Sequence, residues 1–132
     1  VSEVGTLTPG NMAEYIGIRI TEVGDDYLRG TMPVDHRTRQ PAGILHGGAS
    51  VALAETLGSI AAYMTVDRAT KTCVGLEINA NHVRSVREGE VTGTAKPLHI
   101  GSSTQVWSIE ITDAQGRLVC VSRITIAVLE KR

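Results

Sequence analysis

The pattern of hydrophobic and polar positions divides the 132-residue chain into two alternating stretches, one long apolar segment and four further strand-like runs. The two alternating stretches, at residues 18–23 and 27–34, are separated by a Gly-Asp-Asp turn and predict a β-hairpin. A short helix is expected before them, at residues 10–16. A polar loop is expected after them, at residues 35–45, because proline and glycine interrupt regular structure there.

The second half of the chain is typical of one helix followed by a meander of strands. Residues 47–64 are apolar nearly all round a helix, which predicts that the helix is buried. The strands are expected at about residues 73–83, 90–99, 103–112 and 118–129. Pro97 cannot donate a ladder hydrogen bond, so it predicts an edge position or a bulge. One helix among about six antiparallel strands indicates a single α+β domain over residues 1–132, with the helix packed on one face of the sheet.

Composition and charge exclude several function classes. The chain is 42% hydrophobic and 20% charged, with a net charge of −1, so no overall field attracts nucleic acid or an anionic membrane. Three tyrosines, one tryptophan and no phenylalanine do not supply a platform for stacking bases. We therefore expect neither a nucleic acid nor a membrane as partner.

The two cysteines favour a reducing compartment. Cys73 and Cys120 lie far apart, each within an apolar strand-like run, which is typical of reduced core thiols rather than a disulfide or a metal site. No segment has the pattern of a signal peptide or the uninterrupted length of a transmembrane helix. The expected location is the cytoplasm.

Glu55 is the only acidic residue in the long helix and the first candidate for chemistry. Burial would place its carboxylate in a low dielectric and disfavour the charged form. The helix positions three and four residues away from Glu55 are mostly small, so this face has room for a ligand. Perturbed acids gather at functional sites. The alternative is that Glu55 reaches an exposed edge or pairs with an arginine.

The helix start is the second candidate feature. It has His46-Gly47-Gly48 where Ser, Thr, Asp or Asn would normally cap the first N–H groups. Glycine lets a ligand approach the backbone closely. Free N–H groups at the positive end of a helix dipole suit an anion or a developing oxyanion. The alternative is an ordinary glycine-rich junction between loop and helix.

Cooperation between these two features requires two chains. Gly47 and Glu55 are eight residues apart, which is about 12 Å along a helix. They therefore cannot both reach one carbonyl group from the same chain. If they cooperate, a second copy of the helix must run antiparallel beside the first, with two equal sites about a two-fold axis. The sequence predicts a homodimer.

A carboxylate facing an oxyanion hole indicates attack on an acyl carbonyl. Glu55 could activate water as a general base or attack directly to give an anhydride, and the sequence leaves both open. Gln40 could donate to the carbonyl or be a solvated loop residue, and His46 could polarise the site or hold the turn. The sequence has no G-x-S-x-G elbow and no metal-ligand spacing. We expect no metal and no cofactor.

Residues 38–59, TRQPAGILHGGASVALAETLGS, closely resemble the hotdog-fold acyl-coenzyme A thioesterases. The nearest group contains the 1,4-dihydroxy-2-naphthoyl-coenzyme A, enterobactin-proofreading and phenylacetate-pathway thioesterases. Further matching stretches are TMPVD (31–35), GLEINANHVR (75–84) and PLHIGSSTQVWSIEI (97–111). The resemblance implies an antiparallel sheet wrapped around one long central helix, in subunits that form dimers and then tetramers. It also implies hydrolysis of an acyl-CoA thioester, with an aryl group such as hydroxybenzoyl or dihydroxynaphthoyl, in which CoA is part of the substrate.

The resemblance also assigns roles to individual residues. Glu55 matches the catalytic carboxylate of the family, and Gly47 matches the oxyanion-hole amide that comes from the partner subunit. Gln40 and His46 match polar residues at the thioester carbonyl. Ser59 matches a helix residue near the attacking water or the acyl group, and His82 matches a pocket histidine. Ile60 is a further candidate for substrate binding. The candidates for contact with the phosphates of CoA are Arg84, Arg87 and the turn Gly101-Ser102-Ser103.

Strand alternation gives an alternative to a binding role for His82. It puts His82 on the same face as Val74, Leu76 and Ile78, where a lone histidine is usually a core group with its hydrogen bonds satisfied.

Two other function classes stay open. A hotdog dehydratase or hydratase acting on acyl thioesters would carry an H-F-P-G-type loop or an Asp/His pair, and neither is present in the sequence. A non-catalytic acyl-binding module could lose its carboxylate freely, whereas this chain has Gln40, His46, Gly47 and Glu55 together. An acyl carrier protein is an alternative to CoA as the carrier. The sequence does not identify the natural acyl group.

Overall fold

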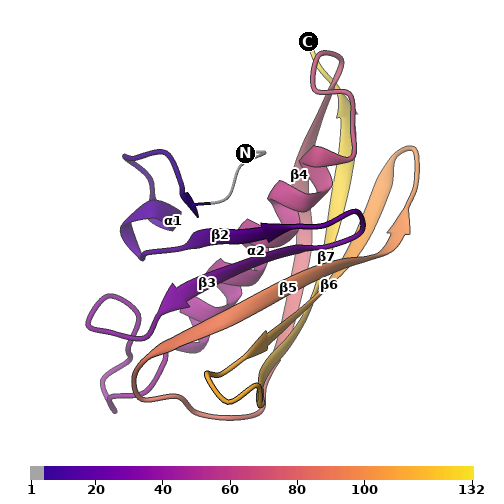
Figure 1. Cartoon of the computed structure of the whole chain (residues 1–132). Coiled ribbons are helices and arrows are strands. Elements are labelled where there is room, and N and C mark those ends of the chain that lie inside the picture. The colour runs from indigo at the N-terminus through magenta and orange to yellow at the C-terminus, as the bar shows by residue number, and fades with distance from the viewer. Residues whose placement is uncertain (1–4) are drawn as a thin grey trace.

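The computed structural model describes residues 5–132, which form one antiparallel sheet curved around a long helix (Figure 1). The strands are β1 (Gly5–Thr6), β2 (Arg19–Val23), β3 (Leu28–Pro33), β4 (Lys71–His82), β5 (Glu90–Ile100), β6 (Thr104–Thr112) and β7 (Leu118–Glu130), and the helices are α1 (Met12–Tyr15) and α2 (Gly47–Met64). The strand order is β1-β2-β3-β5-β6-β7-β4. Strand β4, which follows α2 in the chain, therefore lies at one edge of the sheet.

The predicted α+β architecture is confirmed. The long helix begins and ends at the predicted residues, and the six predicted strands begin and end within two residues of the expected positions. Strand β1 is an additional, seventh strand, which the pattern does not reveal because two residues are too few to alternate. The bulge predicted at Pro97 is present between Pro97 and His99. The alternative of an edge strand is wrong, because β5 lies between β3 and β6.

Glycines in the sheet bring α2 close to it. Leu57 on α2 is fully buried. Gly30 and Gly93 pair across β3 and β5 beneath this side chain. A Cβ atom on Gly30 would lie 2.8 Å from one Leu57 methyl group, and a Cβ atom on Gly93 would lie 2.7 Å from the other. The two glycines therefore leave the space that the leucine side chain fills. This contact turns one face of α2 toward the sheet and the opposite face away from it.

A buried hydrogen-bond chain attaches the end of α2 to β6. The amide nitrogen of Gln105 donates to the hydroxyl of Thr65 over 2.7 Å, and the indole N–H of Trp107 donates to the Gln105 oxygen over 2.8 Å. The hydroxyl of Thr65 donates in turn to the carbonyl of Ala62. The polar atoms of Gln105, which is 1% exposed, are thus satisfied. The turn between β5 and β6 consequently lies at the end of the sheet where α2 ends.

The predicted polar loop before α2 is fixed by hydrogen bonds. Thr38 is buried, its hydroxyl donates to the carbonyl of Pro33 over 2.7 Å, and its carbonyl accepts from the N–H of His46. The N–H of Leu45 donates to the carbonyl of Val86 over 2.7 Å. These bonds hold the loop beside the first turn of α2.

The thiol predictions agree with the structure. Cys120 is buried, Cys73 is half-buried, and both are free. Burial raises the pKa of both thiols. Within residues 5–132, none of the helices combines the length and the apolar character needed to cross a membrane.

Asp35 and Arg37 connect this loop to α1. The Nη2 atom of Arg37 lies 2.7 Å from Oδ2 of Asp35, and its Nη1 donates to the carbonyl of Tyr15 over 3.0 Å. The hydrogen bond from the Arg37 guanidinium lowers the pKa of Asp35 from 3.8 to about 2. A carboxyl group whose pKa is lower in the folded chain than in the unfolded chain stabilises the fold at pH values above its unfolded pKa. This contribution is lost as the pH falls through its folded pKa.

We therefore expect Asp35→Asn to weaken the dependence of stability on pH between about pH 4 and pH 2. The pair is partly exposed, so solvent reduces the size of the effect. The measurement is the free energy of unfolding in urea at several pH values in that range. Asp25→Asn, at an exposed acid in the β2–β3 turn, is the control and should keep the wild-type slope. An Asp35→Asn slope equal to that of the wild type would contradict the assignment.

Candidate active site

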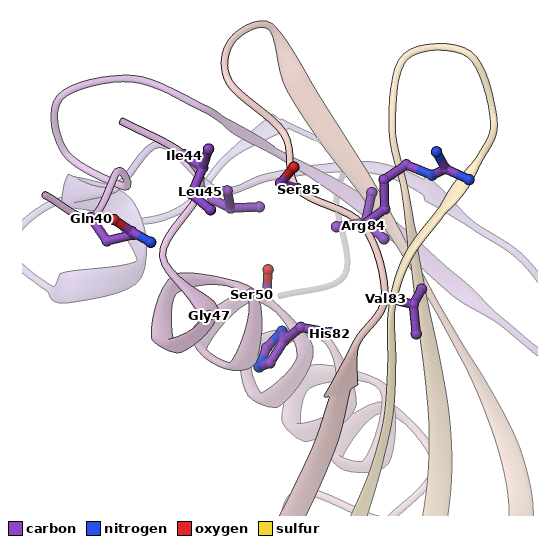
Figure 2. Close-up of a pocket in the computed structure, with 10 residues that line it drawn as sticks. Gln40, Ile44, Leu45, Gly47, Ser50, His82, Val83, Arg84 and Ser85 are labelled. Carbon is purple, nitrogen blue, oxygen red and sulfur yellow. The ribbon is translucent and has the colours of Figure 1, made fainter. Parts of the chain in front are cut away.

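The start of α2 opens onto a cavity of about 410 Å³ (Figure 2). Its walls come from the loop before α2, the first turn of α2 and the segment that follows β4. The polar residues among those that line it are Gln40, Ser50, His82, Arg84 and Ser85, together with the backbone of Gly47. A cavity with a few convergent polar groups is the usual form of a ligand site.

Gly47 supplies a free backbone donor at this cavity. It is the first residue of α2, and its N–H has no hydrogen-bond acceptor within residues 5–132. The N–H groups of Ala49 and Ser50 donate to the carbonyl of His46. The Gly47 amide is therefore available at the positive end of the helix dipole.

His46 caps the helix, which corrects one expectation from the sequence. Its Nδ1 atom accepts from the N–H of Gly48 over 2.7 Å, so the first N–H groups are not all uncapped. His46 is exposed and is not among the residues that line the cavity. This geometry supports the alternative in which His46 holds the turn.

Gln40 presents amide donors toward the cavity. Its side-chain oxygen accepts from the N–H of Ala42, which fixes the plane of the amide. Its backbone N–H donates to the carbonyl of Ile44 over 2.8 Å. Figure 2 shows the amide nitrogen directed toward the start of α2. In this orientation the Gln40 side chain can donate to a ligand oxygen.

His82 lies against Gly47. A Cβ atom on Gly47 would be 2.9 Å from Nε2 of His82. Glycine at position 47 therefore leaves the space that the imidazole occupies. The last residue of β4 is thus placed beside the first residue of α2.

A bulge in β4 changes the face that His82 shares. The register shifts between Gly75 and Glu77, so Leu76 is the extra residue. Beyond the bulge, His82 shares a face with Ile78, which packs toward the core. Val74, before the bulge, lies on the opposite face and is 44% exposed. The predicted common face for His82 and Val74 is wrong, because an extra residue reverses strand alternation.

Glu55 is exposed, so the expectation of a buried carboxylate is wrong for the single chain. The contacts of Leu57 and Gly58 with the sheet turn Glu55 away from the core. The four ion pairs within residues 5–132 join other residues, which rules out the arginine partner in one chain. Its carboxylate lies over β4, since a Cβ atom on Gly75 would be 3.1 Å from Oε2 of Glu55.

Glu55 faces a different space from Gly47. A cavity of about 210 Å³ beside the carboxylate is lined by Met12, Ala13, Ala52 and Thr56. Within one chain, the carboxylate and the free amide therefore open onto separate cavities, as their spacing on the helix predicts.

Ser59 and Ile60 lie close to Glu55 on α2, and both are half-buried. Ile60 packs against the core. Neither residue is among those that line the two cavities. Their assignment to the acyl group stays a prediction.

The candidates for phosphate contact are not gathered in one place. Arg84 lines the cavity at Gly47, whereas Arg87 lines a neighbouring one with Ser85. The turn at Gly101, Ser102 and Ser103 lies elsewhere, because the N–H of Val128 donates to the carbonyl of Ser103 near the end of β7. One chain therefore does not bring this turn and Arg84 together.

Ser50 is a cavity residue that sequence reasoning missed. The signal that could have revealed it is its position three residues after Gly47, which places both on one face of the helix. Among residues 5–132, no three His, Cys, Asp or Glu side chains gather closely enough to hold a metal ion.

Comparison with known proteins identifies the family. The sequence model of the Thioesterase superfamily matches residues 42–120. The chain belongs to the Thioesterase superfamily. It is 61% identical over 126 residues to the 1,4-dihydroxy-2-naphthoyl-CoA hydrolase of Escherichia coli, which covers 96% of this chain and 92% of the relative. It is 55% identical to the proofreading thioesterase EntH of Cronobacter sakazakii, over 91% of this chain and 87% of the relative.

Solved structures agree with this assignment. The crystal structure of a mutant thioesterase from Pseudomonas aeruginosa superposes with a TM-score of 0.89 at 48% identity, covering 90% of this chain and 86% of that chain. The expected hotdog fold is thus confirmed, and the protein is a thioester hydrolase of the Thioesterase superfamily.

Proposed function

We propose that this thioesterase hydrolyses an acyl-CoA thioester with an aryl acyl group, such as hydroxybenzoyl or dihydroxynaphthoyl, to the carboxylic acid and free CoA. One observation carries the proposal: Gly47 has a free helix amide and Glu55 an unpaired carboxylate within the described residues, and the two groups face separate cavities of one chain. Each is half of an acyl-transfer site. The activity for which the Escherichia coli relative is named supports an aryl substrate.

In the proposed dimer, which forms through the edge strand β4, the Glu55 carboxylate of one subunit lies beside the Gly47 amide of the other. Strand β4 pairs only with β7 within the described sheet, so its other edge can pair with a second copy. On β4, Gly75 lies next to the carboxylate of Glu55, and His82 lies next to Gly47. Antiparallel pairing of Gly75 with His82 of the partner subunit therefore places Glu55 beside Gly47 of the partner subunit, twice per dimer.

Exposed apolar side chains support further assembly. Val74 and Leu76 on β4, together with Leu98, Ile100 and Leu129 elsewhere on the sheet, are 44 to 61% exposed. Exposed apolar groups of this kind mark association surfaces. We propose a tetramer of two such dimers. The free thiols support a cytoplasmic location.

In the proposed reaction, Glu55 removes a proton from water and the water oxygen attacks the thioester carbon. The carbonyl oxygen becomes anionic and is stabilised by the Gly47 N–H and by the amide of Gln40. Collapse of the intermediate breaks the carbon–sulfur bond, and the departing thiolate takes up the proton. In the alternative, the Glu55 carboxylate attacks the thioester carbon and expels the thiolate, which gives an anhydride. Water then hydrolyses the anhydride to the acid and free Glu55, and the thiolate takes up the remaining proton. No cofactor takes part in either route.

The two cavities correspond to the two parts of the substrate. Arg84 and Ser85 line the larger one, where they can meet the CoA arm. The smaller one, with Met12, Ala13 and Ala52, surrounds the acyl side of Glu55. Its 210 Å³ is comparable with the apolar cavity of about 150 Å³ that binds benzene in an engineered protein. This size supports an aryl acyl group.

The test is thiol release from a panel of hydroxybenzoyl, phenylacetyl, naphthoyl and medium-chain acyl thioesters, trapped with a chromogenic disulfide. We expect the aryl-CoA thioesters to give the highest kcat/KM. Each acyl group is also presented on an acyl carrier protein to identify the carrier. Hydration of an enoyl thioester without thiol release would favour a hydratase. Tight acyl binding without turnover would favour a binding module.

A further inference from the structure

The first turn of α2 holds a polar group that the reaction above does not use. Ser50 is 2% exposed, yet it lines the cavity with Gly47 and Gln40. Figure 2 shows its hydroxyl pointing into this cavity. Within residues 5–132, the hydrogen bonds of the first turn involve the backbone N–H of Ser50 and not its hydroxyl.

Packing does not explain a hydroxyl at this position. Alanine occurs at positions 49, 52 and 54 of the same helix and is a better helix former than serine. A buried hydroxyl without a hydrogen-bond partner costs free energy. No fully enclosed side-chain polar atom in the described chain lacks a partner, so the Ser50 oxygen is accessible from the cavity. The hydroxyl, which has no partner among the described residues, thus faces the space where a ligand would lie.

We propose that Ser50 is a catalytic residue whose hydroxyl donates a third hydrogen bond to the thioester oxygen, beside those from the Gly47 N–H and the Gln40 amide. The proposal rests on the function proposed above. Residues three apart share a helix face, and each Cβ tilts toward the helix N-terminus. The Ser50 hydroxyl therefore leans back over the first turn, toward the free amide of Gly47. An oxygen atom that lies beside this turn can accept from both donors.

The Ser50 donor acts mainly on the transition state. The thioester oxygen gains negative charge when the carbon is attacked, and a hydroxyl donor binds an anion more strongly than a carbonyl. Ser50 transfers no proton and forms no covalent bond in this role. Its loss should therefore lower kcat and leave KM nearly unchanged.

The test is steady-state thiol release by Ser50→Ala with the best aryl-CoA substrate. We expect kcat to fall by about 10²-fold, with KM within about twofold of the wild type. Ser50→Thr, which keeps the hydroxyl, should recover most of the lost kcat. Ser122→Ala is the matched control, because Ser122 is also 2% exposed but its hydroxyl donates to the carbonyl of Asn79. It should lower the melting temperature without lowering kcat.

A double variant tests whether Ser50 and Gly47 bind the same oxygen. If they do, Ser50→Ala should cost less in the Gly47→Pro background than in the wild type. Wild-type kcat for Ser50→Ala, or a rise in KM alone, would overturn the proposal. A wrong role for Ser50 can be distinguished from a wrong proposed function. If the proposed function were wrong, the unmodified protein itself would release no thiol from any thioester.

Discussion

Glu55→Gln is expected to lower kcat for thiol release by about 10³-fold, because the amide keeps the shape of the side chain but cannot accept a proton. It also cannot attack a carbonyl as a carboxylate does, so the expectation holds for both proposed routes. In the single chain Glu55 is exposed and forms no ion pair within the described residues. The substitution removes no ion pair of the described chain and keeps the shape of the side chain in the proposed dimer, so the melting temperature should not fall.

The measurement is kcat at saturating aryl-CoA, with a second glutamate as control. Glu110→Gln replaces an exposed acid on β6 and should retain wild-type kcat. A Glu55→Gln variant with full activity would remove the carboxylate from the mechanism. One turnover in ¹⁸O-labelled water with excess enzyme separates the two routes. Label in Glu55 identifies the anhydride route, in which water attacks the Glu55 carbonyl of the anhydride, because general-base catalysis labels only the released acid.

The fold was predictable because its largest element has an unambiguous pattern. Residues 47–64 are apolar over many consecutive positions, and α2 occupies this range. Features that no residue type indicates were not predictable, in contrast to the bulge that Pro97 predicts. The cap formed by His46 depends on a side-chain rotamer, and the reversed face of Val74 depends on a single extra residue in β4. Neither changes the hydrophobic pattern.

The exposure of Glu55 has a different cause. An apolar sequence pattern predicts that a surface is buried. It does not indicate whether the surface is buried within the same chain or against another subunit. Val51 and Ala52, one turn before Glu55 on its face of α2, are apolar but only half-buried in the single chain. The helix face that carries Glu55 therefore has the composition of a buried surface without an intramolecular cover. This is expected if the cover is a second subunit.

Gly47→Pro is expected to lower kcat by about 10²- to 10³-fold, since it removes the N–H that we propose stabilises the oxyanion. Proline is favoured at the first position of a helix. It also requires an extended residue before it, and His46 has φ −69° and ψ 130°. Gly47→Ala is the control, because it adds the same Cβ atom against His82 but keeps the N–H. Equal losses for the two variants would assign the effect to crowding of His82.

Refolding Glu55→Gln and Gly47→Pro chains together is expected to recover about one quarter of wild-type activity, because half of the dimers are mixed and one of their two sites is intact. In the intact site of the proposed dimer, Glu55 of one chain faces Gly47 of the other. Each variant refolded alone is the control and should stay inactive. No recovery in the mixture would mean that one chain supplies both groups. Recovery requires the acid and the amide at one thioester to come from different chains, since no chain in the mixture carries both.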